Sequence, residues 1–233
     1  MIRSPLRRFA IVTLAFAGLI ATLVPKPATA AGTTVISCRA SALRLTGLGP
    51  LSFIGTVEPV VSNSSQSVCA NDADGVINFL LPAGLGFVNL LNTQTTFTKT
   101  AALHRGTASA SVTGVLLDIP ALTITVSVLN SQVEVTCHID GTRPAGNRIV
   151  GTSTVVGLTI GGQPIVVPPG PLDIPLPLNG ILHLNEKTRT PPGTTPHVLT
   201  QRALHLDLTV AAGGLVDLLD LVIAESVGDY HLP

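Results

Sequence analysis

The chain has 233 residues, of which 45% are hydrophobic and 11% are charged, and its formal net charge is zero. This balance supports a sizeable core and excludes a disordered chain. The basic residues are few and scattered, so they form no patch able to neutralise several phosphates, and we expect no nucleic-acid partner.

Residues 1–30 have the organisation of an export signal. A basic start precedes an apolar run over residues 9–24, and the stretch ends in the small residues Ala-Thr-Ala. We predict a signal peptide over residues 1–30, cleaved between Ala30 and Ala31, and a single secreted β domain over residues 31–233. The apolar run is short and is followed by Pro-Lys-Pro, so we expect no membrane anchor in the mature chain. The expected location is extracellular, or loosely associated with the cell surface.

Alternation with a period of two residues dominates the middle of the chain. It is clearest over residues 107–115, 123–128 and 132–139, where threonine and valine recur. Such alternation sends one set of side chains to a core and the other to water, as in half-buried antiparallel strands. Turn signals lie between these segments, at Asn130-Ser131, Asp140-Gly141, Gly161-Gly162 and Asn179-Gly180.

We therefore predict an all-β fold, an antiparallel β-sandwich or open barrel of many short strands with at most one or two short helices. The helix candidates are residues 87–92 and 213–222. The second of these fits a turn leading into a final strand equally well.

The segment Pro168–Thr190 has an unusual proline pattern. From Pro169 to Pro177 the prolines occupy odd positions, and leucine or isoleucine fills the even positions from Leu172 onward. Prolines on alternate positions remove N–H donors from one edge of a strand only, which predicts a protected edge strand rather than a linker. A three-residue loop near Asn179-Gly180 would then pair Leu176 with Leu184.

Four segments in the second half of the chain carry a family resemblance: "GTSTVVGLTIGGQPI", "ILHLNEKTRT", "ALHLDLTV" and "LVIAES". In this order they resemble the choice-of-anchor P family of secreted actinobacterial proteins, and the similarity runs from about Ala40 to Ser226. The resemblance implies a secreted or surface β protein with no assigned catalytic residue.

The three cysteines are Cys38, Cys69 and Cys137, an odd number in a chain that meets oxidising conditions. The family resemblance implies a Cys69–Cys137 disulfide and leaves Cys38 without a partner. A rival pairing of Cys38 with Cys69 would join two N-terminal segments and leave Cys137 free.

Several patterns suggest sites but have simpler interpretations. Lys99 with Glu186 could form an isopeptide-type pair, although a solvated strand end is the preferred interpretation. Residues 71–75 resemble the start of a calcium loop that lacks its first and last acidic ligands, so we interpret them as a polar turn. Among six histidines none forms a two-histidine helical pair, and His205 with Asp207 is interpreted as the wet side of a strand. We expect no metal and no cofactor.

Catalytic patterns are weak as well. No glycine-flanked serine of the nucleophile-elbow type is present, and carboxylates such as Asp217 and Asp220 show no sign of burial. We expect no catalytic residues and no enzyme activity. The favoured function is a non-catalytic structural or interaction module of the bacterial exterior, with an unidentified protein or cell-envelope partner. The alternatives are a ligand- or glycan-binding β-sandwich and a secreted hydrolase built around His183, His205 and Asp207.

Overall fold

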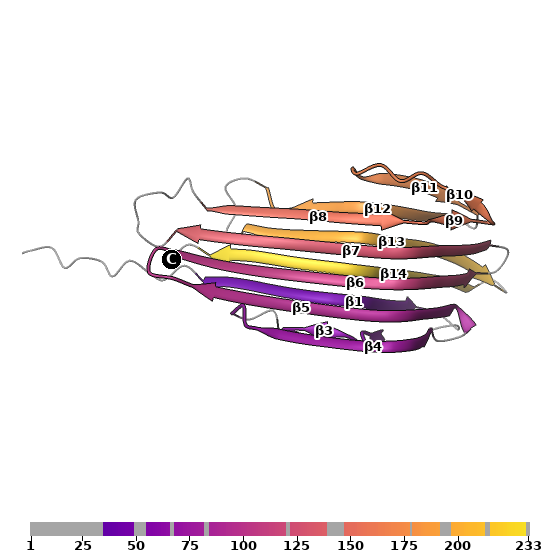
Figure 1. The fold of residues 1–233 in the computed structure, drawn as a ribbon. Helices are drawn as coiled ribbons and strands as arrows, with labels where there is room; N and C mark the ends of the chain where they lie inside the picture. Colours follow the sequence, from indigo (N-terminus) through magenta and orange to yellow (C-terminus); the bar gives the residue numbers. More distant parts are fainter. Residues whose placement is uncertain are drawn as a thin grey trace, which may run out of the picture. The chain divides into compact units, whose positions relative to one another are not determined.

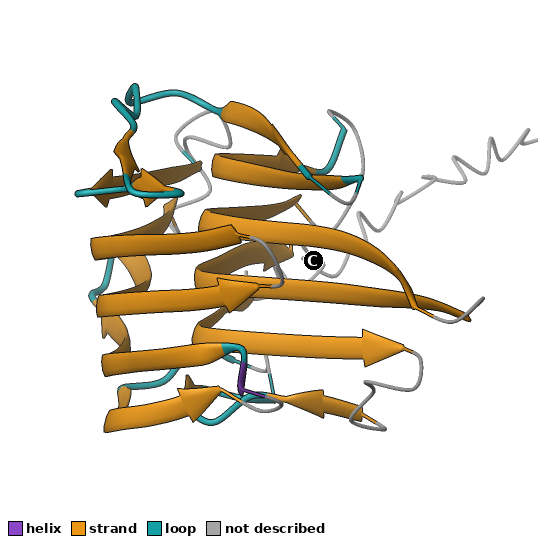
Figure 2. Ribbon diagram, turned by 90° about the vertical axis from the view of Figure 1, so that its right-hand side faces the viewer, coloured by secondary structure: helices purple, strands orange, loops and turns teal. Residues whose placement is uncertain are grey.

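The computed structural model describes residues 35–48, 55–65, 68–81, 84–119, 122–138, 147–177, 179–191, 197–212 and 215–231. The predicted signal peptide over residues 1–30 and its cleavage site between Ala30 and Ala31 lie outside these ranges. The described residues form two antiparallel sheets packed together, with no closed barrel (Figure 2). They contain no α-helix, and the short helical turn at Gly84 is of the 3₁₀ type. The predicted all-β sandwich is confirmed.

One sheet, here called sheet A, contains the first and the last strand of the chain, β1 and β14, which lie side by side (Figure 1). Its order is β11 (Leu172–Leu176), β12 (Gly180–Arg189), β13 (His197–Ala212), β14 (Leu215–His231), β1 (Val35–Leu48) and β2 (Gly55–Val57), with β3 (Val61–Ser62) also paired to β1.

The facing sheet, sheet B, is built from the middle of the chain (Figure 1). Its order is β10 (Gln163–Pro164), β9 (Thr159–Ile160), β7 (Leu122–His138), β6 (Leu103–Ile119), β5 (Gly86–Lys99) and β4 (Asp72–Leu81), with β8 (Arg148–Val156) also paired to β7.

Branched aliphatic side chains fill most of the space between the sheets. In the described part of the chain, no Phe or Tyr side chain is fully buried, in keeping with the low aromatic content. Polar pairs also cross the core: the Oγ atoms of Ser131 and Ser226 lie 2.8 Å apart, and Ser62 Oγ lies 2.8 Å from Thr93 Oγ1. Each of these four hydroxyls therefore has a partner, which offsets the cost of removing it from water.

The long strands change, part-way along, which of their side chains face the core. In β6 the even-numbered residues are buried up to Val112, and the odd-numbered residues are buried from Val115 onward. At this point the pairing of β6 with β7 omits Gly114 and Ser127, although the register is the same on both sides of the gap. The strand thus inverts its faces without the extra residue that a β-bulge would contain.

The omitted residues line up across each sheet, and we call the two lines inversion rows. Inversion row B comprises Asn78, Asn89, Gly114, Ser127 and Gly157, and inversion row A comprises Asn185, Ala203, Ala224 and Ala42.

Positive φ angles occur on alternate strands of each inversion row, at Asn78, Gly114 and Gly157 in row B and at Asn185 and Ala224 in row A. A residue in the left-handed region breaks the two-residue repeat of a strand, which accounts for the inversion. Row B needs glycine at two of these positions, because an added Cβ would lie 2.2 Å from the Asn89 side chain at Gly114 and 2.2 Å from Ser127 Oγ at Gly157.

The proline-rich segment forms an edge strand, as predicted. β11 is the last strand of sheet A, and its Asp173 and Pro175 are exposed while Leu176 is buried. Pro175 pairs with Ile181 of β12 but has no N–H, so its nitrogen faces the open edge of the sheet. The linker interpretation is wrong.

The loop between β11 and β12 has three residues, as predicted, but the predicted register is wrong. Leu176 pairs with Gly180 instead of Leu184. Asn179, at φ +54°, is the last loop residue, and Gly180 already belongs to the strand. A Cβ at Gly180 would lie 2.3 Å from Leu208, so close packing against β13 draws this glycine out of the turn.

Other local predictions have mixed outcomes. The turn at Gly161-Gly162 is confirmed between β9 and β10, and both glycines have positive φ. The turn expected at Asn130-Ser131 is wrong, since both residues lie inside β7. Residues 87–92 belong to β5, and the described residues of 213–222 belong to β14, so neither helix forms. The Asp140-Gly141 turn lies outside the described residues.

The predicted Cys69–Cys137 disulfide is also wrong. Cys38 is bonded to Cys69, and Cys137 is a free, buried cysteine on β7. The Cys69 N–H donates to the carbonyl of Ile36, which holds the segment before β4 alongside β1 in sheet A and brings Cys69 to Cys38. The rival pairing is confirmed, and a disulfide is consistent with an extracellular protein. No helix among the described residues is long and apolar enough to cross a membrane.

Candidate functional site

The outer face of sheet A carries a band of charged side chains that crosses from β11 to β1. Inversion row A creates this band. In a regular strand the charged residues on the two sides of the row would lie on opposite faces of the sheet, whereas the inversion places all of them on the outer face. Arg202 and His205 of β13 are three residues apart, yet both contact the same oxygen, Oε2 of Glu186, at 3.0 Å each. Arg39 and Arg44 of β1 are five residues apart, yet both contact Oε1 of Glu225.

Glu225 is the centre of one half of the band. Its side chain is only 3% exposed, and it receives contacts from Arg202 at 2.7 Å, Arg44 at 3.0 Å and Arg39 at 3.4 Å. Arg39 also pairs with Glu58. Three cations around one buried carboxylate make this half a structural cluster that joins β13, β14 and β1.

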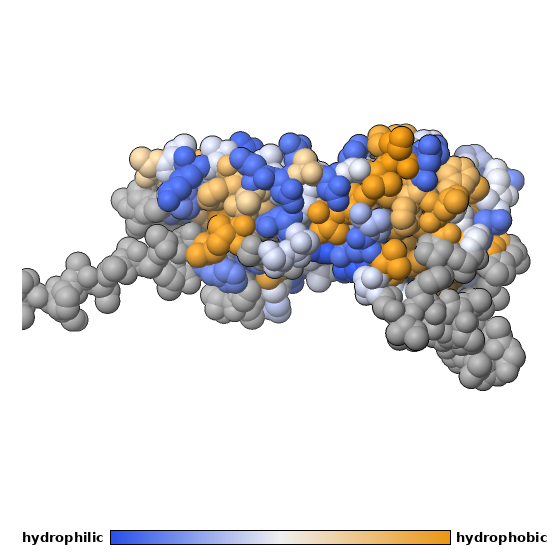
Figure 3. Space-filling view, turned by 90° about the horizontal axis from the view of Figure 1, so that it is seen from below, coloured by the Kyte–Doolittle hydropathy of each residue, from blue (hydrophilic) through white to orange (hydrophobic). Residues whose placement is uncertain are grey.

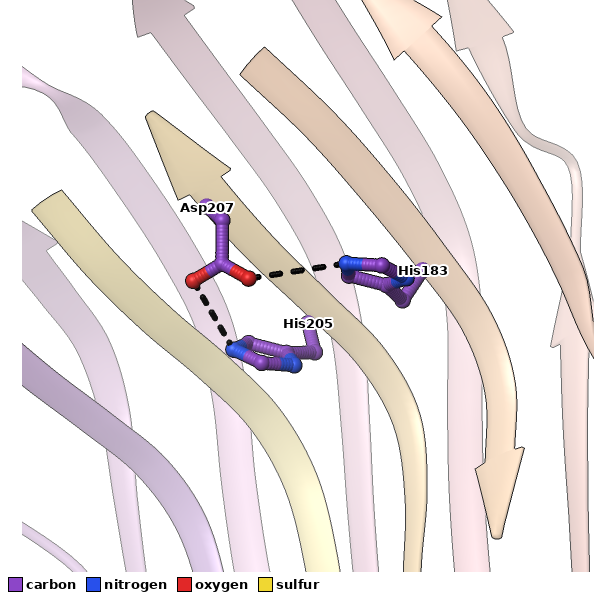
Figure 4. A group of neighbouring side chains, drawn as sticks. All are labelled: His183, His205 and Asp207. Carbon is purple, nitrogen blue, oxygen red and sulfur yellow. Dashed lines mark ion pairs between the residues drawn. The ribbon is translucent and has the colours of Figure 1, made fainter. Parts of the chain in front are cut away.

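Two histidines form the other half of the band. His183 lies on β12 and His205 lies directly opposite it on β13, with ring centroids 5.3 Å apart. The carboxylate of Asp207 lies between the two rings, with one oxygen 3.5 Å from Nε2 of His183 and the other 3.2 Å from Nε2 of His205 (Figure 4). Asp220 of β14 lies 3.2 Å from the same Nε2 of His205.

The second nitrogen of each ring is held by a separate carboxylate. Nδ1 of His183 lies 2.8 Å from Asp173 Oδ1, and Nδ1 of His205 lies 3.0 Å from Glu186 Oε2. Both rings are therefore oriented with Nε2 toward Asp207.

The carboxylates around His205 dominate its titration. Burial alone would lower the pKa of His205, but its contacts with Asp220, Glu186 and Asp207 outweigh burial and raise the pKa to about 9. The hydrogen bond from His205, together with the Arg202 guanidinium, lowers the pKa of Glu186 to about 2 against the opposing effect of burial. In the absence of another cation at this place, His205 is a protonated partner of its acids at neutral pH.

The structure separates some of the residues that the sequence suggested as pairs. Lys99 lies on β5 in sheet B, whereas Glu186 lies on β12 in sheet A with Arg202 and His205 as partners. The isopeptide-type pair is not formed. Nor do residues 71–75 form a calcium loop: Asp72 and Asp74 lie in β4, where their carboxylates accept hydrogen bonds from the backbone N–H groups of Asn63 and Val61.

Sequence reasoning paired His205 with Asp207 on one strand face, and the structure confirms that placement. It did not find Arg39, Arg44, Arg202 or Glu225, because a strict period of two places these residues on conflicting faces. The remaining histidines lie elsewhere: His104 on β6, His138 at the end of β7, His197 against Tyr230, and His231 beside Asp229.

Among the described residues, two open hollows lie on sheet B, away from His183 and His205. One, of about 540 Å³, is lined by residues of β4, β5 and β6 that include Asp74, Asn92 and Gln94. The other, of about 550 Å³, is adjacent and includes Asn71 and Phe97. Neither contains a histidine or a nucleophile–base pair.

Comparison of the chain with protein-family models, with curated proteins and with solved structures finds no match in any of the three.

Proposed function

We propose that the chain is an exported, non-catalytic interaction module of the bacterial cell exterior that binds its partner along strand β4. The leader pattern of residues 1–30 and the Cys38–Cys69 disulfide support export. The resemblance to the choice-of-anchor P family supports the same assignment.

The single observation that carries the proposal is the apolar, open edge at β4. Ile77 and Leu80 on this strand are 70% and 76% exposed, and Phe87, which pairs with Leu80 from β5, is 37% exposed. β4 is the last strand in the order of sheet B, and among the described residues only β5 pairs with it. Figure 3, which views the molecule from the β4 side, shows apolar surface gathered over part of this face. Exposed apolar side chains on an open strand edge mark a surface for binding another chain.

The two edge strands β11 and β4 differ in how they are protected. β11 is five residues long and presents Asp173 and Pro175 on its exposed side. β4 is ten residues long and contains no proline, and its acidic residues Asp72 and Asp74 are confined to one end. No described strand pairs with the outer edge of the apolar half of β4, residues 76–81, and this edge suits the addition of a strand from a partner. The partner that this apolar edge fits is a protein that presents an apolar strand.

The test is fractionation of the native exported protein after mild cross-linking, in parallel with two variants. The double variant Ile77→Lys/Leu80→Lys places charges on the β4 edge. Val166→Lys is the matched control, because Val166 is 93% exposed but lies outside any strand. We expect wild type and the control to co-fractionate with a cross-linked protein partner and the double variant to appear free in the medium.

Three kinds of result would overturn the proposal. The first is a wild-type protein that appears in the medium as an uncross-linked monomer. The second is a double variant that keeps the same partner, or a control that loses it to the same extent. Capture of wall glycan or lipid in place of protein would also overturn it, because strand addition requires a polypeptide.

A further inference from the structure

The two histidines of the charged band are oriented as metal ligands are. Protein histidines that bind a metal donate the N–H of the other ring nitrogen to a carboxylate, which fixes the tautomer and aims the free nitrogen at the ion. Asp173 and Glu186 hold Nδ1 of His183 and His205 in this way. Nε2 of each ring is then available on the side of Asp207 (Figure 4).

A second observation concerns Asp220. Its Oδ1 atom is buried and lies 3.2 Å from Nε2 of His205, which is its only ion-pair partner among the described residues. In the metal-free protein the protonated His205 is the cation beside this oxygen, and a metal ion that displaced the proton from Nε2 would take over that role. Oδ1 of Asp220 and the carboxylate of Asp207 flank the same nitrogen, so one cation could contact all three groups.

The charge of the band has the sign that a cation requires. Across the ion pairs of the described residues it contains six carboxylates, at Glu58, Asp173, Glu186, Asp207, Asp220 and Glu225, and three arginines, at Arg39, Arg44 and Arg202. When both histidines are neutral, as metal ligands must be, three negative charges remain in the band. Among the ion pairs of the described residues, no arginine or lysine contacts Asp173, Asp207 or Asp220, so the remaining negative charge lies beside the two histidines.

The ligand atoms of the two histidines and Asp207 lie only slightly farther apart than the ligands of a bound zinc ion. Potential ligand atoms of His183, His205 and Asp207 all lie within 4.8 Å of one another. Tetrahedral zinc has ligand bonds of about 2.0–2.2 Å, which places its ligand atoms roughly 3.3–3.6 Å apart. The two contacts between Nε2 atoms and Asp207 are 3.5 and 3.2 Å, so the approach of the rings to each other is the main adjustment.

We propose that His183, His205 and Asp207 bind one divalent transition-metal ion, with Asp220 as the fourth ligand. Two imidazoles and two carboxylates suit zinc, and Ni²⁺ or Cu²⁺ in a distorted geometry, whereas Mg²⁺ and Ca²⁺ prefer oxygen ligands alone. The ion would join β12, β13 and β14 across the outer face of sheet A. This site is separate from the β4 edge and does not depend on the proposed function.

The probe is ZnCl₂ added to the mature protein after treatment with EDTA and removal of the chelator, with binding followed by isothermal titration calorimetry. We expect saturable binding of one zinc per chain, no saturable heat with MgCl₂, and an X-ray absorption spectrum of two nitrogen and two oxygen ligands. His183→Gln should weaken binding by more than 100-fold. Asp173→Asn, which changes only the residue that orients His183, should weaken it by roughly 10–100-fold.

The matched control is His231→Gln. His231 also lies on sheet A beside an aspartate, with its Nε2 3.2 Å from Asp229 Oδ1, but it is remote from the proposed ligands in the strand register. Asp207→Asn serves as a second ligand variant, because Asp207 is about half exposed and its replacement is compatible with folding. Circular dichroism checks that each variant is folded.

The proposal is overturned if wild type shows no saturable zinc binding, or if His183→Gln and Asp207→Asn bind zinc as wild type does. Loss of binding in His231→Gln equal to that in His183→Gln would also overturn it, because the zinc would then lie at another place. A spectrum with six oxygen ligands would exclude the two imidazoles.

Discussion

Replacing Glu225 with glutamine removes the one negative charge that three arginines share at the centre of sheet A. The Glu225 side chain is 3% exposed, and Arg39, Arg44 and Arg202 are between 13% and 24% exposed. Removing one partner of a buried ion pair costs about 3–5 kcal/mol, because the remaining charges are left in a poorly solvated place. Arg39 and Arg202 keep Glu58 and Glu186 as second partners, so we expect the lower end, about 3 kcal/mol.

The assay is urea unfolding of Glu225→Gln followed by far-UV circular dichroism, since the chain contains no tryptophan. A loss of about 3 kcal/mol corresponds to a melting temperature roughly 6–12 °C lower for a domain of this size. The matched control is Glu134→Gln, which removes the exposed pair between Glu134 and Arg105 on sheet B and should cost less than about 1 kcal/mol. The reasoning is refuted if the two variants lose the same stability at unchanged m-value.

Three further predictions follow from the strand edge and the cysteines. Pro175→Val restores an N–H on the open edge of β11, so sedimentation should reveal concentration-dependent association that Pro169→Val, outside the strand, does not show; a monomeric Pro175→Val would contradict the edge assignment. Replacing Cys38 and Cys69 together by alanine opens a loop with a sequence separation of 31 and should lower the free energy of unfolding by up to roughly 4 kcal/mol, measured in urea; an unchanged midpoint would contradict it. Burial raises the pKa of Cys137 to about 11, so this thiol should stay unmodified by iodoacetamide at pH 8 in the folded protein and react once urea unfolds it, as peptide mapping would show; rapid labelling of the folded protein would contradict its burial.

The sandwich class could be predicted because burial alternates on each side of the inversion rows, for example over residues 103–112 of β6 and 129–138 of β7. The lengths of the strands could not be predicted, because an inversion divides the alternating sequence pattern of one strand into two shorter patterns. β7 contains two alternating runs whose buried positions are even up to Val126 and odd from Leu129. The polar pair Asn130-Ser131 lies directly after the change from even to odd buried positions. A polar pair between two alternating runs has the sequence pattern of a turn between two strands.

The same inversion explains the false helix at residues 87–92. Val88 and Leu91 of β5 are both fully buried, and their spacing of three residues is that of a helix face. Asn89 belongs to inversion row B, which is why a strand shows this spacing. The charged band was hidden for a related reason, since Arg202 and His205 share a face only after the inversion at Ala203.

The disulfide could not be deduced from the sequence, because three cysteines allow three pairings and the choice depends on which strands lie adjacent. Cys69 follows β3 in the chain and lies beside β1, a neighbour that its own sequence context does not reveal.

The inversion rows also limit how the strands can slide past one another. Strands such as β6 and β7 are 17 residues long and rich in alternating threonine, serine and valine. In regular strands of this composition, a shift by two residues would keep every side chain on its proper face. In this protein the same shift would move Gly114 away from Ser127 and Asn89. It would also place a residue with a Cβ where the left-handed conformation is required. Because each row runs through neighbouring strands in succession, one misaligned hairpin would propagate its mismatch to the next. The inversion rows thus favour one strand register over the alternatives that would have almost equal side-chain packing.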